Sequence, residues 1–172
     1  MLKVAPPPHA SRIRARYPCF GNSKFKIENS KFSRYPCEMD GFTFSCSIQV
    51  RWRDLDAFGH VNNATFATYL EIARTAVWRE RFGGREAMDI PFFVKNLSID
   101  FKQPLALYDT VKVWLRVGEI RGASFTFEYA VEANGEVAAE AETQLASVDN
   151  TTGRVVRISP GMRAKLEKLQ TD

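Results

Sequence analysis

The order of the predicted elements indicates an α+β fold, in which an antiparallel sheet of about five to six strands wraps around one long central helix. Three observations predict it. A strand pattern comes first, a single helical pattern of about twenty residues follows, and the later strand patterns are joined by tight turns. A doubly wound parallel sheet would need helices between the later strands, and the sequence indicates none there. We therefore expect residues 41–172 to form one domain.

The first strand and the helix flank a polar loop. Apolar and polar residues alternate with a period of two over residues 42–53, which predicts a strand with Trp52 on its buried face. Residues 54–63, DLDAFGHVNN, are typical of a loop that ends in helix-capping asparagines. Gly83–Gly84 should end the helix that follows. The apolar residues that recur at helical spacing are Phe66, Leu70, Ala73 and Val77.

The second half of the chain is dominated by strand patterns. They span residues 97–101, 111–117, 125–131 and 139–145, and a short one follows at 154–158. Turn sequences at 133–136 and 149–153 separate the last three. Ser159 and Pro160 then form a typical helix start, which predicts a short terminal helix.

The composition is that of a globular chain with a hydrophobic core, because 45% of the residues are apolar and 26% are charged. No run approaches the ~18 apolar residues that a membrane-spanning helix needs. Three cysteines and two histidines, without CxxC or HExxH spacing, provide neither a disulfide framework nor a dedicated zinc site. We therefore expect no membrane span, no metal, no cofactor and a reducing, cytoplasmic environment.

The positive net charge belongs to one end of the chain. Residues 1–36 contain eight Lys or Arg and one acidic residue, whereas residues 37–172 contain sixteen basic and nineteen acidic residues. The expected domain is therefore mildly acidic, and it offers no basic stripe for nucleic acid. We expect no nucleic-acid partner.

Residues 1–40 have a different character from the rest. They contain five of the eight prolines and no sustained periodicity, so we expect a disordered, basic N-terminal extension. Three interpretations remain open: a presequence for organellar import, a basic interaction tail, or translation that begins at Met39.

The segment Val50–Arg74, VRWRDLDAFGHVNNATFATYLEIAR, resembles the signature of the hotdog-fold thioesterases of the 4-hydroxybenzoyl-CoA thioesterase class. The resemblance joins a strand, the DxDxxGHVNN loop and the head of the helix, and the later strand order agrees over most of residues 42–160. It implies a hotdog fold and hydrolysis of an acyl-CoA thioester. It also implies a homodimer or homotetramer with each active site at a subunit interface. Residues 1–40 have no counterpart in this family.

Hydrolysis of a thioester needs a nucleophile or general base, and a donor for the developing oxyanion. The free N–H groups in the first turn of a helix are such donors. The resemblance assigns the carboxylate to Asp56 and the donor to the backbone N–H near Asn63. Direct attack by Asp56 and activation of water both remain open. Asp54 should support the loop, and His60 is either an acid–base group or a structural residue.

Coenzyme A phosphates favour Arg and Lys beside backbone donors. The turn at residues 120–125 lies where hotdog thioesterases often contact the nucleotide, so Arg121 and Ser124 are candidates for substrate binding. An acyl-carrier protein would use the same region. An acyl-carrier-protein thioesterase and a non-catalytic acyl-CoA-binding hotdog protein therefore remain alternatives, and turnover of an acyl-CoA would distinguish the second.

The acyl pocket is expected to involve aromatic residues of the helix and of the segment that follows it. The candidates are Phe66, Tyr69, Phe92 and Phe93. Glu71 and Arg74 lie three residues apart on the helix and should form a pair at the surface or in an interface.

Overall fold

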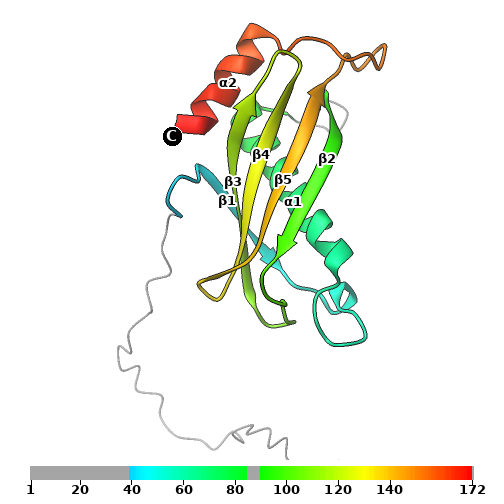
Figure 1. Ribbon diagram of the computed structural model, residues 1–172, viewed down its shortest axis with the longest axis vertical. Helices are drawn as coiled ribbons and strands as arrows, with labels where there is room; N and C mark the ends of the chain where they lie inside the picture. The colour runs from blue at the N-terminus through cyan, green and yellow to red at the C-terminus, as the bar shows by residue number, and fades with distance from the viewer. Residues whose placement is uncertain (1–38, 85–89, 172) are drawn as a thin grey trace, which may run out of the picture. The chain divides into compact units, whose positions relative to one another are not determined.

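The structure, a computed structural model, describes residues 39–84 and 90–171 (Figure 1). These residues belong to one compact unit. The predicted N-terminal extension, apart from its last two residues, lies outside the described residues. No helix among the described residues is long and apolar enough to cross a membrane.

Five antiparallel strands form one sheet in the order β1-β3-β4-β5-β2. They are β1 (Phe44–Gln49), β2 (Phe92–Phe101), β3 (Thr110–Ile120), β4 (Ser124–Ala133) and β5 (Glu136–Ser147). Because short turns join β3, β4 and β5, these strands are neighbours at the centre of the sheet. The two strands that flank the helix in sequence, β1 and β2, form the edges. This arrangement confirms the predicted α+β architecture.

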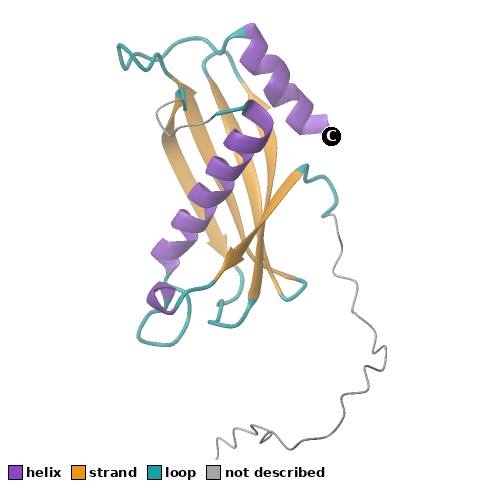
Figure 2. Ribbon diagram, turned by 180° about the vertical axis from the view of Figure 1, so that it is seen from behind, coloured by secondary structure: helices purple, strands orange, loops and turns teal. Residues whose placement is uncertain are grey.

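The long helix crosses one face of the sheet (Figure 2). It consists of α1 (Asn63–Val77) and one further turn of π-helix, η2 (Trp78–Phe82). Gly83 ends it in the left-handed conformation, with a φ of 78° that favours glycine. The extent predicted from the periodicity is therefore confirmed. The buried residues of α1 are Phe66, Tyr69, Leu70, Ala73 and Val77.

The core lies between this helix and the sheet. Alternate residues of β3 and β4 face the helix and are almost fully buried; they are Val111, Val113, Leu115, Val117, Phe125, Phe127, Tyr129 and Val131. Each such side chain contributes roughly 1.5–3 kcal/mol to folding. The terminal helix α2 (Pro160–Thr171) packs near β3 through Leu166 and Leu169. The Ser159 hydroxyl accepts a hydrogen bond from the Met162 N–H at 3.3 Å, which confirms the predicted cap.

The first strand is shorter than predicted, because it ends at Gln49. Trp52 was expected on its buried face, but its side chain is 78% exposed. The Asp54 carboxylate accepts hydrogen bonds from the backbone N–H and the guanidinium of Arg51, and residues Trp52–Asp54 fold into the 3-10 turn η1. This turn ends the alternation of buried and exposed residues.

Two other boundaries differ from the prediction. The strand expected to begin at Leu97 begins at Phe92, and a bulge between Val94 and Asn96 breaks its periodicity. The short strand expected at 154–158 is a single β-bridge between Val148 and Val155. The turn predicted before it, at 149–153, is present: the Asp149 carboxylate accepts hydrogen bonds from the N–H groups of Thr151 and Thr152.

Candidate active site

The loop that precedes α1 is closed by its own hydrogen bonds. The Asp56 N–H donates to the His60 carbonyl at 2.7 Å, and the Gly59 N–H donates to the Asp56 carbonyl at 3.1 Å. A β-bridge between Leu55 and Val61 joins the two arms. Gly59 has a φ of 80°, which a residue with a side chain rarely adopts. The loop is therefore a tight turn that fixes the position of Asp56.

The two oxygens of the Asp56 carboxylate have different surroundings. Oδ1 accepts hydrogen bonds from the backbone N–H groups of Phe58 at 2.8 Å and His60 at 3.3 Å. Oδ2 accepts none from any described residue. One oxygen thus orients the half-buried carboxylate, and the other is available for chemistry.

The helix begins immediately after this loop. Asn62 is its N-cap, and the Asn62 side chain accepts a hydrogen bond from the Ala64 N–H at 2.9 Å. The N–H of Asn63 donates to no residue in the described part of the chain. It remains a free donor at the positive end of the helix dipole.

Asp56, His60, Asn63 and Phe66 line one cleft of about 280 Å³. The structure therefore brings together four of the predicted site residues. The other residues that line the cleft are Val61, Phe101, Lys102, Gln103 and Pro104. Phe101 is the last residue of β2 and residues 102–104 follow it. These four residues were not predicted, because nothing in their own sequence indicates that they lie beside the loop.

Asp54 is buried and its carboxylate is surrounded by donors. It accepts the Arg51 guanidinium at 2.9 Å, the Arg51 N–H at 2.9 Å and the Tyr69 hydroxyl at 3.1 Å. The hydrogen bond from the guanidinium is the main reason that the pKa of Asp54 is lowered. The Asp54 carbonyl also accepts the Asn62 N–H at 2.8 Å, which ties the start of the loop to the helix cap. These contacts agree with the supporting role expected for Asp54.

Tyr69, a predicted substrate-binding residue, does not line the cleft. Its side chain has no exposed surface, and its hydroxyl donates to Asp54. Burial raises the pKa of this hydroxyl. The structure therefore supports a contact with the loop rather than a contact with substrate.

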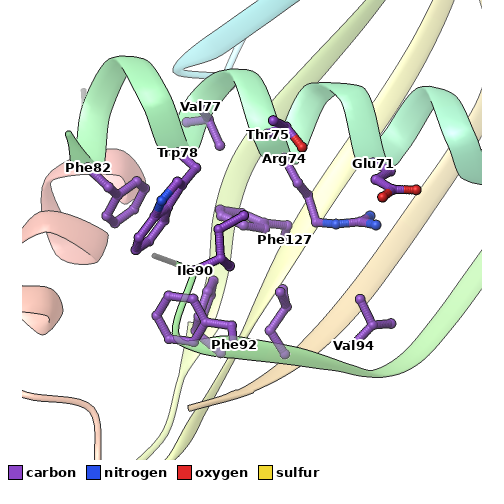
Figure 3. Close-up of a pocket in the computed structure, with 12 residues that line it drawn as sticks. Glu71, Arg74, Thr75, Val77, Trp78, Phe82, Ile90, Phe92, Val94 and Phe127 are labelled. Atoms are coloured by element: carbon purple, nitrogen blue, oxygen red, sulfur yellow. The ribbon is translucent and has the colours of Figure 1, made fainter. Parts of the chain in front are cut away.

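A second cavity, of about 170 Å³, lies farther along the helix, between α1–η2 and strands β2, β4 and β5 (Figure 3). Phe92, a candidate for the acyl pocket, lines this cavity, whereas Phe93 does not line it and is 60% exposed. Most of its wall is apolar: Val77, Trp78, Phe82, Ile90, Phe92, Val94, Phe125, Phe127 and Leu145. Glu71, Arg74 and Thr75 complete the lining.

The expected pair between Glu71 and Arg74 is not formed, since no ion pair within 4.0 Å joins them. The Arg74 guanidinium instead reaches the sheet. It donates to the Tyr129 hydroxyl and to Thr143 Oγ1, both at 3.4 Å. Helical spacing places Glu71 and Arg74 on one face of the helix. The hydrogen bonds to the buried hydroxyls of β4 and β5 direct the Arg74 guanidinium toward the sheet and away from Glu71.

The predicted coenzyme A residues lie at the other end of the sheet from the Asp56 cleft. Ser124 pairs with residue 146 of β5, whereas Phe101 of the cleft pairs with residue 139. Arg121 is exposed, and its guanidinium forms an ion pair with Glu119 at 2.8 Å. Within one chain, the structure does not bring these residues to Asp56.

Across residues 39–84 and 90–171, no three His, Cys, Asp or Glu side chains gather in a group that could hold a metal ion. Cys46 is a free thiol, and burial raises its pKa to about 11. It therefore stays protonated and unreactive near neutral pH.

Several known proteins are similar to this chain. Over 129 residues it is 30% identical to the long-chain acyl-CoA thioesterase FadM of Escherichia coli K12, a match that covers 71% of this chain and 96% of FadM. Over 110 residues it is 33% identical to the acyl-CoA thioesterase YbgC of Haemophilus influenzae, a match that covers 62% of this chain and 81% of YbgC.

Solved structures agree with these relatives. A thioesterase of Thermus thermophilus, crystallised with coenzyme A and Zn, superposes with a TM-score of 0.72 at 33% identity, covering 78% of this chain and 98% of that one. The probable thioesterase YbaW of E. coli superposes with a TM-score of 0.63 at 26% identity, covering 75% of this chain and 100% of YbaW. Residues 50–166 match the family model of the thioesterase-like superfamily. These comparisons confirm the predicted hotdog fold and the predicted thioesterase activity class, and the chain belongs to the thioesterase-like superfamily.

Proposed function

We propose that this protein hydrolyses acyl-CoA thioesters, with Asp56 as the catalytic carboxylate and the Asn63 N–H as an oxyanion donor. One observation carries the proposal: a carboxylate oxygen without a partner and a helix N-terminal N–H without a partner belong to described residues that line one cleft. The names of the similar proteins, acyl-CoA thioesterases of two bacteria, support the same substrate class.

The cleft supplies what the reaction requires. The thioester carbonyl oxygen accepts the Asn63 N–H, and the helix dipole stabilises the negative charge that develops on this oxygen. In one route Asp56 attacks the carbonyl carbon, the C–S bond breaks to release the coenzyme A thiolate, and water then hydrolyses the resulting anhydride to the free acid. In the other, Asp56 removes a proton from a water that attacks the carbonyl carbon, and the C–S bond breaks to give the free acid and the thiolate, which takes up the proton. Both routes need the negative charge of Asp56. His60 also lines this cleft, and its ring makes no hydrogen bond to a described residue. In this proposal the ring contacts the thioester.

The smallest competent unit in this proposal is a homodimer that pairs β2 with its copy. As an edge strand, β2 has backbone donors and acceptors without partners, and such an edge favours pairing with another strand. Its helix side also exposes apolar surface, since Val94 is 50%, Leu97 37% and Phe101 41% exposed. A second copy paired with β2 would cover both the unpaired backbone groups and this apolar surface. Pairs of such dimers would give the homotetramer.

A two-fold axis through the middle of β2 would place the start of one strand beside the end of the other. Phe92 lines the apolar cavity and Phe101 lines the Asp56 cleft. The cavity of one subunit would therefore open toward the cleft of its partner. Ser124 and Arg121 share the end of the sheet where β2 begins, so the same pairing would bring them near the second active site.

A panel of short, long and aromatic acyl-CoAs tests the proposal, with release of the free thiol as the readout. Turnover of at least one acyl-CoA is expected, and turnover of none would contradict the proposal. Hydrolysis of acyl-carrier-protein thioesters alone would instead support the carrier-protein alternative. Saturable binding of acyl-CoA without any hydrolysis would support a non-catalytic binding protein.

A further inference from the structure

We propose that the apolar cavity between η2 and β2 is the acyl-binding site, and that it takes compact, apolar acyl groups no larger than about one aromatic ring. This inference rests on the proposed function and adds the class of acyl group. It differs from the long-chain preference stated in the name of the similar E. coli protein.

The volume of the cavity sets the size limit. At about 170 Å³ it is close to an apolar cavity of about 150 Å³ that is known to bind benzene in another protein. A phenyl ring or a chain of about six carbons would therefore fill it. A fatty acyl chain with more than a dozen carbons would not fit without rearrangement of the core.

The far end of the cavity is closed by packed rings. Trp78 stacks on Phe82 with centroids 5.0 Å apart, and the edge of Phe92 meets Trp78 at 5.7 Å. Phe125 packs against Phe92 at 4.8 Å. These side chains are at least nine-tenths buried, so their neighbours oppose displacement. The indole of Trp78 also packs against Gly84, where a Cβ atom would lie 1.7 Å from its Nε1.

The polarity of the cavity sets the orientation of the acyl group. Glu71 and Arg74 lie at one end of the lining, whereas Trp78 and Phe82 lie at the other (Figure 3). The polar thioester belongs near the charged end, so the acyl terminus lies among the rings. A terminal carboxylate would be buried there without a cationic partner, because the one buried side-chain donor left unpaired among the described residues is the neutral Trp78 Nε1–H. The site therefore disfavours dicarboxylic acyl groups.

The first experiment compares kcat/KM for benzoyl-, hexanoyl-, palmitoyl- and succinyl-CoA with the full-length protein. We expect benzoyl- and hexanoyl-CoA to exceed the other two by at least about tenfold, since one methylene that a pocket cannot hold changes specificity by about 10–200-fold. Equal or faster turnover of palmitoyl-CoA would overturn the inference and leave thioester hydrolysis intact. If no acyl-CoA is cleaved, the proposed function itself fails.

The second experiment changes the shape of the cavity. Val94 lines it and is half exposed, so Val94→Trp fills its mouth from the edge strand without disturbing the core. We expect kcat/KM for benzoyl-CoA to fall at least about tenfold, with a smaller effect on acetyl-CoA. Ile72→Trp, at a partly exposed residue of α1 that lies outside β2 and outside the lining of the cavity, is the control and should keep both values.

Trp78→Phe tests the closed end independently of the edge strand. The smaller ring lengthens the cavity, so the preferred straight chain should become longer by about one or two carbons. This readout is a shift in preference, which partial loss of folding would not produce. An unchanged chain-length profile in both Trp78→Phe and Val94→Trp would overturn the assignment of this cavity.

Discussion

Two carboxylates separated by one residue have opposite environments in this protein. Asp54 is buried and accepts hydrogen bonds from Arg51 and Tyr69, whereas Asp56 has one oxygen without a partner among the described residues. The sequence alone shows two similar aspartates in one loop, and only the resemblance to a family assigns them different roles. Tyr69 lies fifteen residues away and was expected at the substrate. Its bond to Asp54 depends on how α1 packs on the loop, which periodicity does not reveal.

Removing the Tyr69 hydroxyl tests this division of roles. Tyr69→Phe keeps the buried ring but takes one donor from the Asp54 carboxylate, so the free energy of unfolding should fall by about 1.5–3 kcal/mol. KM for acyl-CoA should change little, because the ring does not reach the cleft. Denaturant titration and steady-state kinetics measure the two effects. Unchanged stability together with a large rise in KM would show that Tyr69 contacts substrate after all.

The lowered pKa of Asp54 predicts a pH dependence of stability. In the folded protein the Arg51 guanidinium holds this pKa below its ordinary value near 3.8. The stabilisation is therefore fully present above about pH 4 and is lost as the pH falls through the folded-state pKa. Between pH 5 and pH 2.5, the midpoint of urea unfolding should fall more steeply for the wild type than for Asp54→Asn, which has no charge to lose. Parallel curves would contradict this account of the ion pair.

At the scale of elements, periodicity predicted the long helix and the central strands because each has one face in the core. It failed where side chains outside the core control the backbone. The Asp54 carboxylate ends the first strand by accepting hydrogen bonds from Arg51. Such hydrogen bonds join residues close in the sequence. They are nevertheless hard to predict, because the same polar residues also occur in ordinary strands and loops.

The loop before α1 depends on the backbone of Gly59. A Cβ atom added at Gly59 would meet no atom within 4 Å, so Gly59→Ala causes no clash. The φ of 80° is unfavourable for alanine, so the strain would lie in the backbone. We expect a loss of about 1–2 kcal/mol in unfolding free energy. We also expect a lower kcat, since the turn orients Asp56 through the His60 N–H. Gly122→Ala, at a glycine with open space and no positive φ, is the control. Equal stability of both variants would refute the strain.

At the scale of the whole molecule, the sequence predicted four residues of the cleft but not their distant neighbours. Residues 101–104 reach the cleft only because β2 lies at the edge beside the helix start. The apolar cavity was missed for the same reason, since its wall combines residues from α1, η2 and three strands. The turn at residues 120–125 was enough to select Arg121 and Ser124 as candidates for substrate binding. That they lie far from Asp56 within one chain depends on the strand register, which the sequence does not reveal.

The exposed edge of β2 predicts self-association. At micromolar concentration the protein should run as a dimer or tetramer, and Leu97→Glu should shift it toward monomer, because the substitution adds a charge to the apolar helix side of the edge strand. Ser98→Gln, a polar substitution on the opposite face that adds no charge beside Glu142, is the control. Light scattering and turnover should be measured on the same samples. A catalytically active monomer would refute an active site at the subunit interface.

The most direct test of thioester hydrolysis by Asp56 is the turnover of the Asp56→Asn protein. The amide keeps the size of the side chain and its Oδ1 hydrogen bonds, so the loop should still fold, and thermal melts will verify this. Because both chemical routes need the negative charge, kcat should fall by ~10²–10⁴-fold, while KM changes less. A well-folded Asp56→Asn protein that retains more than about a tenth of wild-type turnover would contradict the assignment.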